Sequence, residues 1–309
     1  MLQYAGKTSL SSFKYSISLG IVKKLKPWSQ SAGNTYILKS ETPETIRNNT
    51  EKIKDISIHV PTHLRPLNNE QFGYYLAGII DGDGHFNNKQ QLVIVFSSAD
   101  IQLAYYIKNI LGFGQIKKVK AKNVFLYVIS NKKGILKTIN LINNKLRTTS
   151  IYNQVLNNVL NNTKYLNENI MFKINNSNDF DNHWIAGFCD ADSSFQIKII
   201  NRENKPRPEI RLKFQIVACN NLRPQKHNDL LSIKKVFGGN ISYSKSQNTY
   251  YYASTSLGSA KKIINYFDDY HLQSSKYRSY LQWRKTYILL QDIKHLKKIE
   301  LNTVNVLKE

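Results

Sequence analysis

Cysteine is almost absent from this 309-residue sequence, which contains Cys189 and Cys219 and no others. Two cysteines exclude a disulfide framework and a four-cysteine zinc site, and both are expected to be small buried hydrophobic residues. Long apolar runs are also missing, since none approaches the ~18 residues that a membrane-spanning helix needs. Apolar residues nevertheless make up 41% of the chain and aromatic residues 11%. That is enough to build a core, and it excludes a wholly disordered chain.

Acidic residues are scarce as well. The chain has 21 Asp and Glu against 44 Lys and Arg, which gives a formal net charge of +23. Basic residues spread along a whole chain are typical of proteins that bind nucleic acid. An anionic membrane surface is the alternative partner, but the sequence contains no strongly amphipathic basic helix that would lie on one. Composition therefore favours DNA or RNA as the partner, and no membrane.

Residues 1–69 differ from the rest of the chain and are predicted to form an N-terminal extension. No acidic residue precedes Glu41. Acid-poor, Ser-rich N-termini are typical of organellar targeting segments, although those favour Arg and this one uses Lys. The alternative is a poorly ordered extension that continues translation from an upstream reading frame.

The remainder of the chain contains an internal repeat. Residues 75–86 (YLAGIIDGDGHF) match residues 184–195 (WIAGFCDADSSF) at a constant offset of 109 positions, and later segments match at an offset of 125. The difference places 16 extra residues in the second copy, near 201–208 and 220–227, where polar, proline-containing sequence predicts loops. We therefore divide the chain into a first half (70–160), an Asn-rich linker (161–181) and a second half (182–309).

Each half is predicted to contain an apolar helix, two strands, a helix, further strands and more helices. In the second half the apolar residues of two strands are Phe195, Ile197, Ile199, Leu212, Phe214 and Ile216. The polar residues that alternate with them are Ser194, Gln196, Lys198, Arg211, Lys213 and Gln215. A period of two is that of a half-buried antiparallel strand. The polar face either is an ordinary solvated surface or carries side chains that contact bases and phosphates.

Small residues occupy matching positions in the two apolar helices: Ala77 and Gly78 in the first, and Ala186 and Gly187 in the second. Small side chains allow two helix backbones to approach closely. We therefore expect these two helices to pack against each other and to bring their C-terminal ends together.

Two acids lie at each of these helix ends, Asp81 and Asp83 in the first copy and Asp190 and Asp192 in the second. A carboxylate is unfavourable at a helix C-terminus, which carries partial negative charge. Two such ends in contact favour bound cations, and hard divalent ions with oxygen ligands suit them. Metal-bound carboxylates on a pseudo-twofold axis are suited to phosphodiester hydrolysis, with one centre for each strand of a duplex.

Three other interpretations of the motif were weighed. An EF-hand loop is excluded, because counting from Asp81 places Phe86 and Leu92 where that loop needs Gly and Glu. A simple helix-stop turn explains one copy but not the repetition of twelve residues. Acids that cap structure without any metal remain possible.

The two motifs, their spacing and the strands after each resemble those of the LAGLIDADG homing endonucleases, specifically the single-chain, two-repeat, intron-encoded members, over roughly residues 70–290. The resemblance implies an α+β fold built as a pseudo-twofold tandem repeat of αββαββα units. Two antiparallel sheets would form one DNA-binding saddle, with the motif helices packed at the interface. It also implies a monomer with an internal pseudo-dimer, a double-stranded DNA target and an organellar, mitochondrial location.

The resemblance further implies that Asp83 and Asp192 bind Mg²⁺ (or Mn²⁺), with the backbone carbonyls of Gly82 and Ala191 as further ligands. Lys276 matches a basic residue that the family places near the active site, whereas the matching position of the first half is Ser150. For a polar residue on a neighbouring strand, Ser98 and Ala218 occupy the expected positions. The candidate DNA contacts are His85, Asn87, Gln91, Gln196, Lys198, Arg211, Lys213 and Gln215.

Three functions remain after this comparison. The first is a site-specific, metal-dependent double-strand DNA endonuclease active in intron homing. The second is an RNA maturase that assists splicing of its host intron, with or without nuclease activity. The third is a catalytically inert DNA-binding regulator. The presence of both Asp83 and Asp192 favours cleavage.

Overall fold

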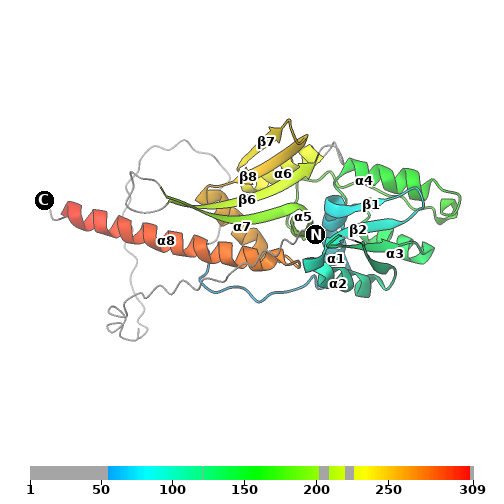
Figure 1. Cartoon of the computed structure of the whole chain (residues 1–309), viewed down its shortest axis with the longest axis horizontal. Helices are drawn as coiled ribbons and strands as arrows, with labels where there is room; N and C mark the ends of the chain where they lie inside the picture. The colour runs from blue at the N-terminus through cyan, green and yellow to red at the C-terminus, as the bar shows by residue number, and fades with distance from the viewer. Residues whose placement is uncertain (1–54, 121, 202–208, 220–225, 307–309) are drawn as a thin grey trace, which may run out of the picture. The chain divides into compact units, whose positions relative to one another are not determined.

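The computed structural model describes residues 55–120, 122–201, 209–219 and 226–306. The first half contains α1 (Asn69–Asp83), β1 (Gly84–Phe86), β2 (Leu92–Ser97), η2 (Ser98–Asp100), α2 (Ile101–Leu111), β3 (Gln115–Lys118), β4 (Val124–Ile129), α3 (Lys132–Ile142), α4 (Thr149–Gln154) and the π-helical η3 (Val155–Leu160). The second half contains α5 (Trp184–Asp192), β5 (Ser193–Ile200), β6 (Glu209–Cys219), α6 (Lys226–Phe237), β7 (Asn240–Ser244), β8 (Thr249–Ser254), α7 (Leu257–Asp269) and α8 (Lys276–Val306), as Figure 1 shows. The predicted αββαββα repeat is confirmed. No described helix has both the length and the apolar character needed to cross a membrane.

Each half contains one four-stranded antiparallel sheet, as predicted. The strand orders are β1-β2-β4-β3 and β5-β6-β8-β7, so the two sheets have the same topology. In β1 and β2 Gly84 lies opposite Ile94, and in β5 and β6 Ser193 lies opposite Ile216. This register establishes which residues of the two halves are equivalent.

The extra residues of the second half lengthen a hairpin as well as its loops. β5 and β6 have 8 and 11 residues, against 3 and 6 in β1 and β2, and the long hairpin runs beside α8 in Figure 1. The predicted loop near 220–227 was wrong at its end, because Lys226 and His227 already belong to α6. The rest of the two predicted loops, 202–208 and 220–225, lies outside the described residues.

The burial predicted from the alternation in the second half is confirmed in β6 and fails at the far end of β5. Leu212, Phe214 and Ile216 are buried. Ile197 is 40% exposed and Ile199 is 66% exposed. The buried part of β5 lies near Phe195, which packs against aromatic rings of α7 and α8.

The motif helices α1 and α5 are apolar on every face, and both are buried on every face. Asn68 caps α1 by accepting a hydrogen bond from the backbone of Gln71 at 2.9 Å. Every residue from Tyr75 to Gly82 is buried, and so is every residue of α5 up to Asp190. A helix that is hydrophobic on every face belongs in the core rather than at a surface. Cys189 lies on α5 and is fully buried, as expected.

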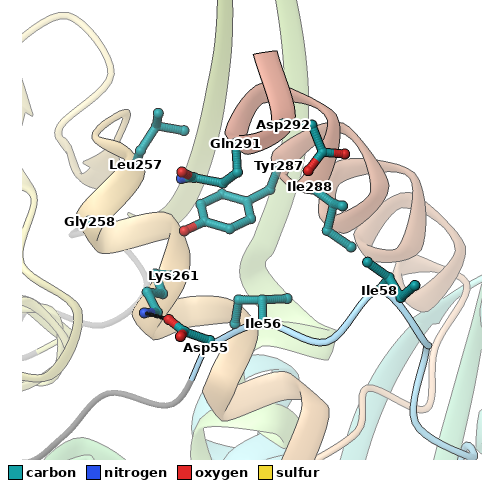
Figure 2. Close-up of a pocket in the computed structure, with 10 residues that line it drawn as sticks. All are labelled: Asp55, Ile56, Ile58, Leu257, Gly258, Lys261, Tyr287, Ile288, Gln291 and Asp292. Atoms are coloured by element: carbon teal, nitrogen blue, oxygen red, sulfur yellow. Dashed lines mark hydrogen bonds and ion pairs between the residues drawn. The ribbon is translucent and has the colours of Figure 1, made fainter. Parts of the chain in front are cut away.

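The described part of the predicted N-terminal extension, residues 55–68, packs against the second half and is called the strap below. Arg284 of α8 donates hydrogen bonds to the carbonyls of Ser57 and His59. Asp55 forms an ion pair with Lys261 of α7 at 2.7 Å. Strap, α7 and α8 together enclose a cavity of about 690 Å³, and Figure 2 shows this ion pair beside it. None of the acidic motif residues lines that cavity.

The segment predicted as a linker also packs against the core. It contains the short 3-10 helix η4 (Leu166–Glu168). Its aromatic residues Tyr165, Phe172 and Phe180 are buried. The connection between the halves is therefore part of the packed structure.

Candidate functional site

The backbones of α1 and α5 are in direct contact at two glycines. A Cβ atom at Gly78 would lie 2.1 Å from the carbonyl oxygen of Trp184, and a Cβ at Gly187 would lie 2.1 Å from the carbonyl oxygen of Tyr75. Contacts this short are impossible for any side chain, so only glycine fits at either position. The neighbouring Ala77 and Ala186 are fully buried.

The same packing brings the C-terminal ends of the two helices together. A Cβ at Gly82 would lie 2.2 Å from the Cβ of Ala191. Asp83 and Asp192 are the next residues along their helices, and both are half-buried rather than enclosed. Both predicted metal-binding acids therefore lie beside the crossing point of the two helix ends.

The first acid of each motif has a different environment. Asp190 accepts hydrogen bonds from the hydroxyl of Tyr75 at 2.7 Å and from the backbone N–H of Gln273 at 2.7 Å. Burial raises the pKa of Asp190, while hydrogen bonds from Ser274, Gln273 and Tyr75 act in the opposite direction. Asp190 is therefore a buried structural group that joins α5 to the start of α8 and to α1.

Asp81 has the equivalent set of partners in the first half. It accepts from the indole Nε1–H of Trp184 at 2.9 Å and from the backbone N–H of Arg147 at 2.8 Å. Trp184 is the repeat equivalent of Tyr75. Each motif helix therefore donates one aromatic hydrogen bond to the buried acid of the other helix.

Asp83 lines a cavity of about 270 Å³ together with Ala191, Lys276, Val95 and Asp100. The ammonium of Lys276 donates to the carbonyl oxygens of Ala191 at 2.6 Å and Cys189 at 3.2 Å. These carbonyls belong to the C-terminal end of α5, where the helix dipole favours a cation. The lysine is thereby held at the C-terminal end of α5, and it lines the same cavity as Asp83 of the first half.

Asp100 was not identified from the sequence. It lies in η2 and accepts from Ser97 Oγ and from the backbone N–H of Ser275, both at 2.7 Å. The second bond joins the two halves beside the cavity. The sequence feature that could have identified Asp100 is an acid shortly after a predicted strand in a chain that has few acids.

The first half offers no lysine equivalent to Lys276. The backbone N–H groups of Arg147 and Thr148 bind Asp81 as those of Gln273 and Ser274 bind Asp190. This equivalence places Ser150 at the position of Lys276. Ser150 Oγ is buried and has no hydrogen-bond partner among the residues that the structure describes. The surroundings of the two motif helix ends are therefore chemically unequal.

Ser98 and Ala218, expected at equivalent positions, are not equivalent. Ile94 lies opposite Gly84 and Ile216 lies opposite Ser193, so Ile94 and Ile216 are repeat equivalents. The equivalent of Ala218 is therefore Phe96, and both residues are buried in the core. Ser98 corresponds to position 220, which lies outside the described residues. The predicted alignment of the two halves was therefore wrong by two residues at this strand.

The predicted DNA contacts of the second half lie on one face of its sheet. Lys198 lies opposite Arg211, and Gln196 lies opposite Lys213. Gln215 continues the same row opposite Ser194. Burial and the nearby charge of Lys198 lower the pKa of Lys213. Like charges crowded on one face indicate a surface suited to an anionic partner.

The predicted contacts of the first half also lie together. His85, Asn87 and Gln91 line a shallow pocket of about 560 Å³. Asn87 donates to the side-chain oxygen of Gln91 at 3.1 Å. By register, Asn87 and Gln91 are the equivalents of Gln196 and Lys213, so the first half carries neutral residues where the second half carries a charge.

The residues at the helix ends are chemically suited to a hard divalent cation. Asp83 and Asp192 provide carboxylate oxygens and Gly82 provides a backbone carbonyl, whereas the carbonyl of Ala191, also predicted as a ligand, accepts a hydrogen bond from Lys276 Nζ at 2.6 Å. Across the described ranges, no group of three or more His, Cys, Asp or Glu side chains is placed to hold a metal ion. A site with few protein ligands suits Mg²⁺, which retains several waters and substrate phosphate oxygens.

Known proteins similar to this chain include three intron-encoded ones. It is 53% identical over 317 residues to the uncharacterized cox1 intron-2 37.2 kDa protein of Schizosaccharomyces pombe, covering 98% of this chain and 94% of that protein. It is 29% identical over 272 residues to the intron-encoded DNA endonuclease aI3 of Saccharomyces cerevisiae, covering 73% and 65%. It is 28% identical over 251 residues to the intron-encoded RNA maturase bI4 of the same yeast, covering 77% and 36%. The chain thus spans less than two thirds of either relative from Saccharomyces cerevisiae.

Solved structures share the fold. I-SmaMI bound to its uncleaved DNA target in the presence of calcium ions matches with a TM-score of 0.56 and 22% identity, over 76% of this chain and 97% of that one. I-AabMI bound to uncleaved DNA matches with a TM-score of 0.56 and 19% identity, over 72% and 93%. The LAGLIDADG endonuclease family matches residues 76–159 and 185–287, once in each half. With two motif helices joined at their glycines and one αββαββα unit after another, this chain belongs to the LAGLIDADG endonuclease family.

Proposed function

We propose that this protein is a site-specific, divalent-metal-dependent DNA endonuclease that hydrolyses one phosphodiester in each strand of a long double-stranded target. The observation that carries the proposal is the contact between Gly82 and Ala191, which places Asp83 and Asp192 beside each other's helix end. Family membership, the net charge of +23 and the basic face of the second sheet support it.

Asp83 and Asp192 would hold the metal ions, with the carbonyl of Gly82 as a further ligand and that of Ala191 joining only when Lys276 Nζ releases its hydrogen bond to it. When bound, Mg²⁺ or Mn²⁺ supplies Lewis-acid stabilisation and a more acidic water. Lys276 adds a fixed positive charge beside Asp83, where negative charge develops on the phosphate. Asp81 and Asp190 maintain the crossing of the helices, so that the two centres keep their separation.

The two sheet faces would hold the duplex as one saddle, with its phosphates on the basic residues of the second half. A single chain with two halves supplies both centres, so the active form is a monomer with an internal pseudo-dimer. The similarity to a protein of a cox1 intron supports a mitochondrial location for this chain, where it would act in intron homing.

The test uses a library of duplexes that includes intronless versions of candidate host genes, incubated with the protein and Mg²⁺. Cleaved ends are then sequenced to identify the target. Asp83→Asn and Asp192→Asn should each abolish double-strand cleavage and leave target affinity within a few-fold, because the charge needed for metal binding is lost while the fold is kept. Asp292→Asn, an exposed acid of α8, is the matched control. Undiminished double-strand cleavage by either motif variant would overturn the assignment.

RNA splicing is the second candidate, and the similarity to a yeast RNA maturase favours it. A maturase would bind its host intron RNA and accelerate splicing without using the two acids. Splicing assays with parent protein and Asp83→Asn separate the two activities. Splicing that persists in a variant unable to cut DNA would show that one chain does both.

A further inference from the structure

The outer face of the first sheet has an apolar centre. Its members, called the valine–leucine patch below, are Val93, Val95, Val124, Leu126 and Val128. Strand pairing places Val93 opposite Val128, Val95 opposite Leu126, and His85 next to Val93. These residues therefore form one continuous surface on the same side of the sheet as the predicted DNA contact His85.

This patch is not the face that forms the core. The alternate residues of the same strands, among them Ile94, Tyr127 and Ile129, are fully buried and belong to the core. Within the patch Val93 is 8% exposed, and the other four residues are half-exposed. The sheet thus has one apolar face inside the protein and a second one that is partly open.

The same positions in the second half are more polar. By register, Val93 corresponds to Gln215, Leu126 to Tyr251 and Val124 to Thr249, whereas Val95 and Val128 correspond to the apolar residues Val217 and Ala253. The second-half row continues outward with Lys213 and Arg211. The two sheet faces therefore differ in chemistry although their backbones have the same topology.

The patch is continuous with the candidate active site. Val95 lines the cavity that contains Asp83 and Lys276. A duplex whose phosphate reaches Asp83 must place its neighbouring base pairs over β2 and β4. Polar residues surround the patch, with His85 and Asn87 on one side and Gln115 and Lys117 of β3 on the other.

We propose that the first-half face recognises an A·T-rich half-site through the 5-methyl groups of thymine, whereas the second-half face recognises its half-site by hydrogen bonds and phosphate contacts. This inference rests on the proposed endonuclease function. The thymine methyl is the apolar group that base pairs present in the major groove. Valine and leucine gain by covering it, whereas over a G·C pair they would bury donors and acceptors without partners.

The test removes methyl groups from the DNA and leaves the protein unchanged. With the selected target in hand, thymines of one half-site at a time are replaced by deoxyuridine, which keeps base pairing and lacks the methyl. Each methyl removed under the patch should weaken binding by about fourfold in Kd. The same replacement in the other half-site should change Kd by less than twofold. Ethylation interference with Lys213→Ala identifies the second half-site, because lost phosphate contacts appear there.

A variant connects the effect to a particular residue. Leu126→Ala should weaken binding of the thymine target and make at least one deoxyuridine replacement in the first half-site neutral, because the methyl has lost its partner. Tyr251→Phe, at the equivalent position of the second half, is the matched control and should leave the first half-site response unchanged. Thermal unfolding of both variants checks that they are folded.

The outcomes separate the two proposals. If the protein neither binds nor cuts any duplex of the library, the endonuclease function fails and this inference with it. If it cuts a defined target but deoxyuridine has equal or no effect in the two half-sites, the inference alone is overturned. A first half-site that is G·C-rich beneath the patch would overturn it as well.

Discussion

Replacing Gly78 by alanine tests the helix crossing on which both proposed catalytic centres depend. The added Cβ would lie 2.1 Å from the carbonyl oxygen of Trp184 and 2.7 Å from the backbone nitrogen of Phe188. A carbon and a carbonyl oxygen approach to about 3.3 Å at closest. The two helices would therefore have to separate by roughly 1 Å, because backbone on both sides cannot rotate away.

The energetic penalty of that separation follows from what the helix contact holds. Forcing an extra methyl into a packed core costs about 1–3 kcal/mol. Separation also weakens the bonds from Tyr75 to Asp190 and from Trp184 to Asp81, and a buried acid that loses a partner costs a further ~1–3 kcal/mol. Alanine returns about 1 kcal/mol through its better helix propensity. We expect a net loss of about 3 kcal/mol in the free energy of unfolding.

Urea unfolding measures this loss, and plasmid cleavage measures its effect on the paired centres. Gly258→Ala is the matched control, because a Cβ there meets no atom within 4 Å and should stabilise α7 by about 0.5–1 kcal/mol. A Gly78→Ala protein with the urea midpoint and cleavage rate of the parent would refute the packing argument.

Two further perturbations have defined outcomes. Lys276→Met removes the ammonium and keeps the aliphatic stem. Cleavage of one strand should slow by about 100-fold, so that nicked plasmid accumulates. Ser150→Ala is the control, and this variant should cut both strands at the rate of the parent. Burial, assisted by the charge of His271, lowers the pKa of His183 to about 4. In the unfolded chain the pKa of this histidine is near 6.5, so below pH 6.5 the unfolded state binds the proton more readily than the folded state. The free energy of unfolding therefore falls as the pH drops from 6.5 towards 4, by about 2 kcal/mol at pH 5. His183→Gln should flatten the stability profile between pH 5 and 7, and an unchanged profile would exclude His183 as the cause.

The fold was largely predictable because the chain contains the same structural unit twice. A constant offset between two copies identifies equivalent helices and strands, and alternation such as that of Phe214 and Ile216 determines which face is buried. The failures occurred where tertiary packing decides. Ile197 and Ile199 alternate correctly, but nothing in their own segment indicates that this part of the strand stays exposed.

The candidate site was predictable to the extent that it is local in sequence. Small residues predicted the helix contact, which the backbone at Gly78 explains physically. The equivalence of Ser98 and Ala218 was misjudged because strand register depends on pairing with distant residues. Asp100 was missed for the same reason, since its partner Ser275 lies 175 positions away in the chain.

Because the motif helices exchange different aromatic donors, the interface of each half fits the other half of this chain and not a second copy of itself. Asp81 receives an indole N–H and Asp190 receives a phenol O–H, and these groups differ in size and reach. In a symmetric pair of two first halves, each Asp81 would face a Tyr75 hydroxyl in place of the Trp184 indole. In a pair of two second halves, each Asp190 would face an indole in place of the hydroxyl. Grafting half of a related protein onto this chain should therefore succeed only when the aromatic residue and the acid it serves are transferred as a matched set.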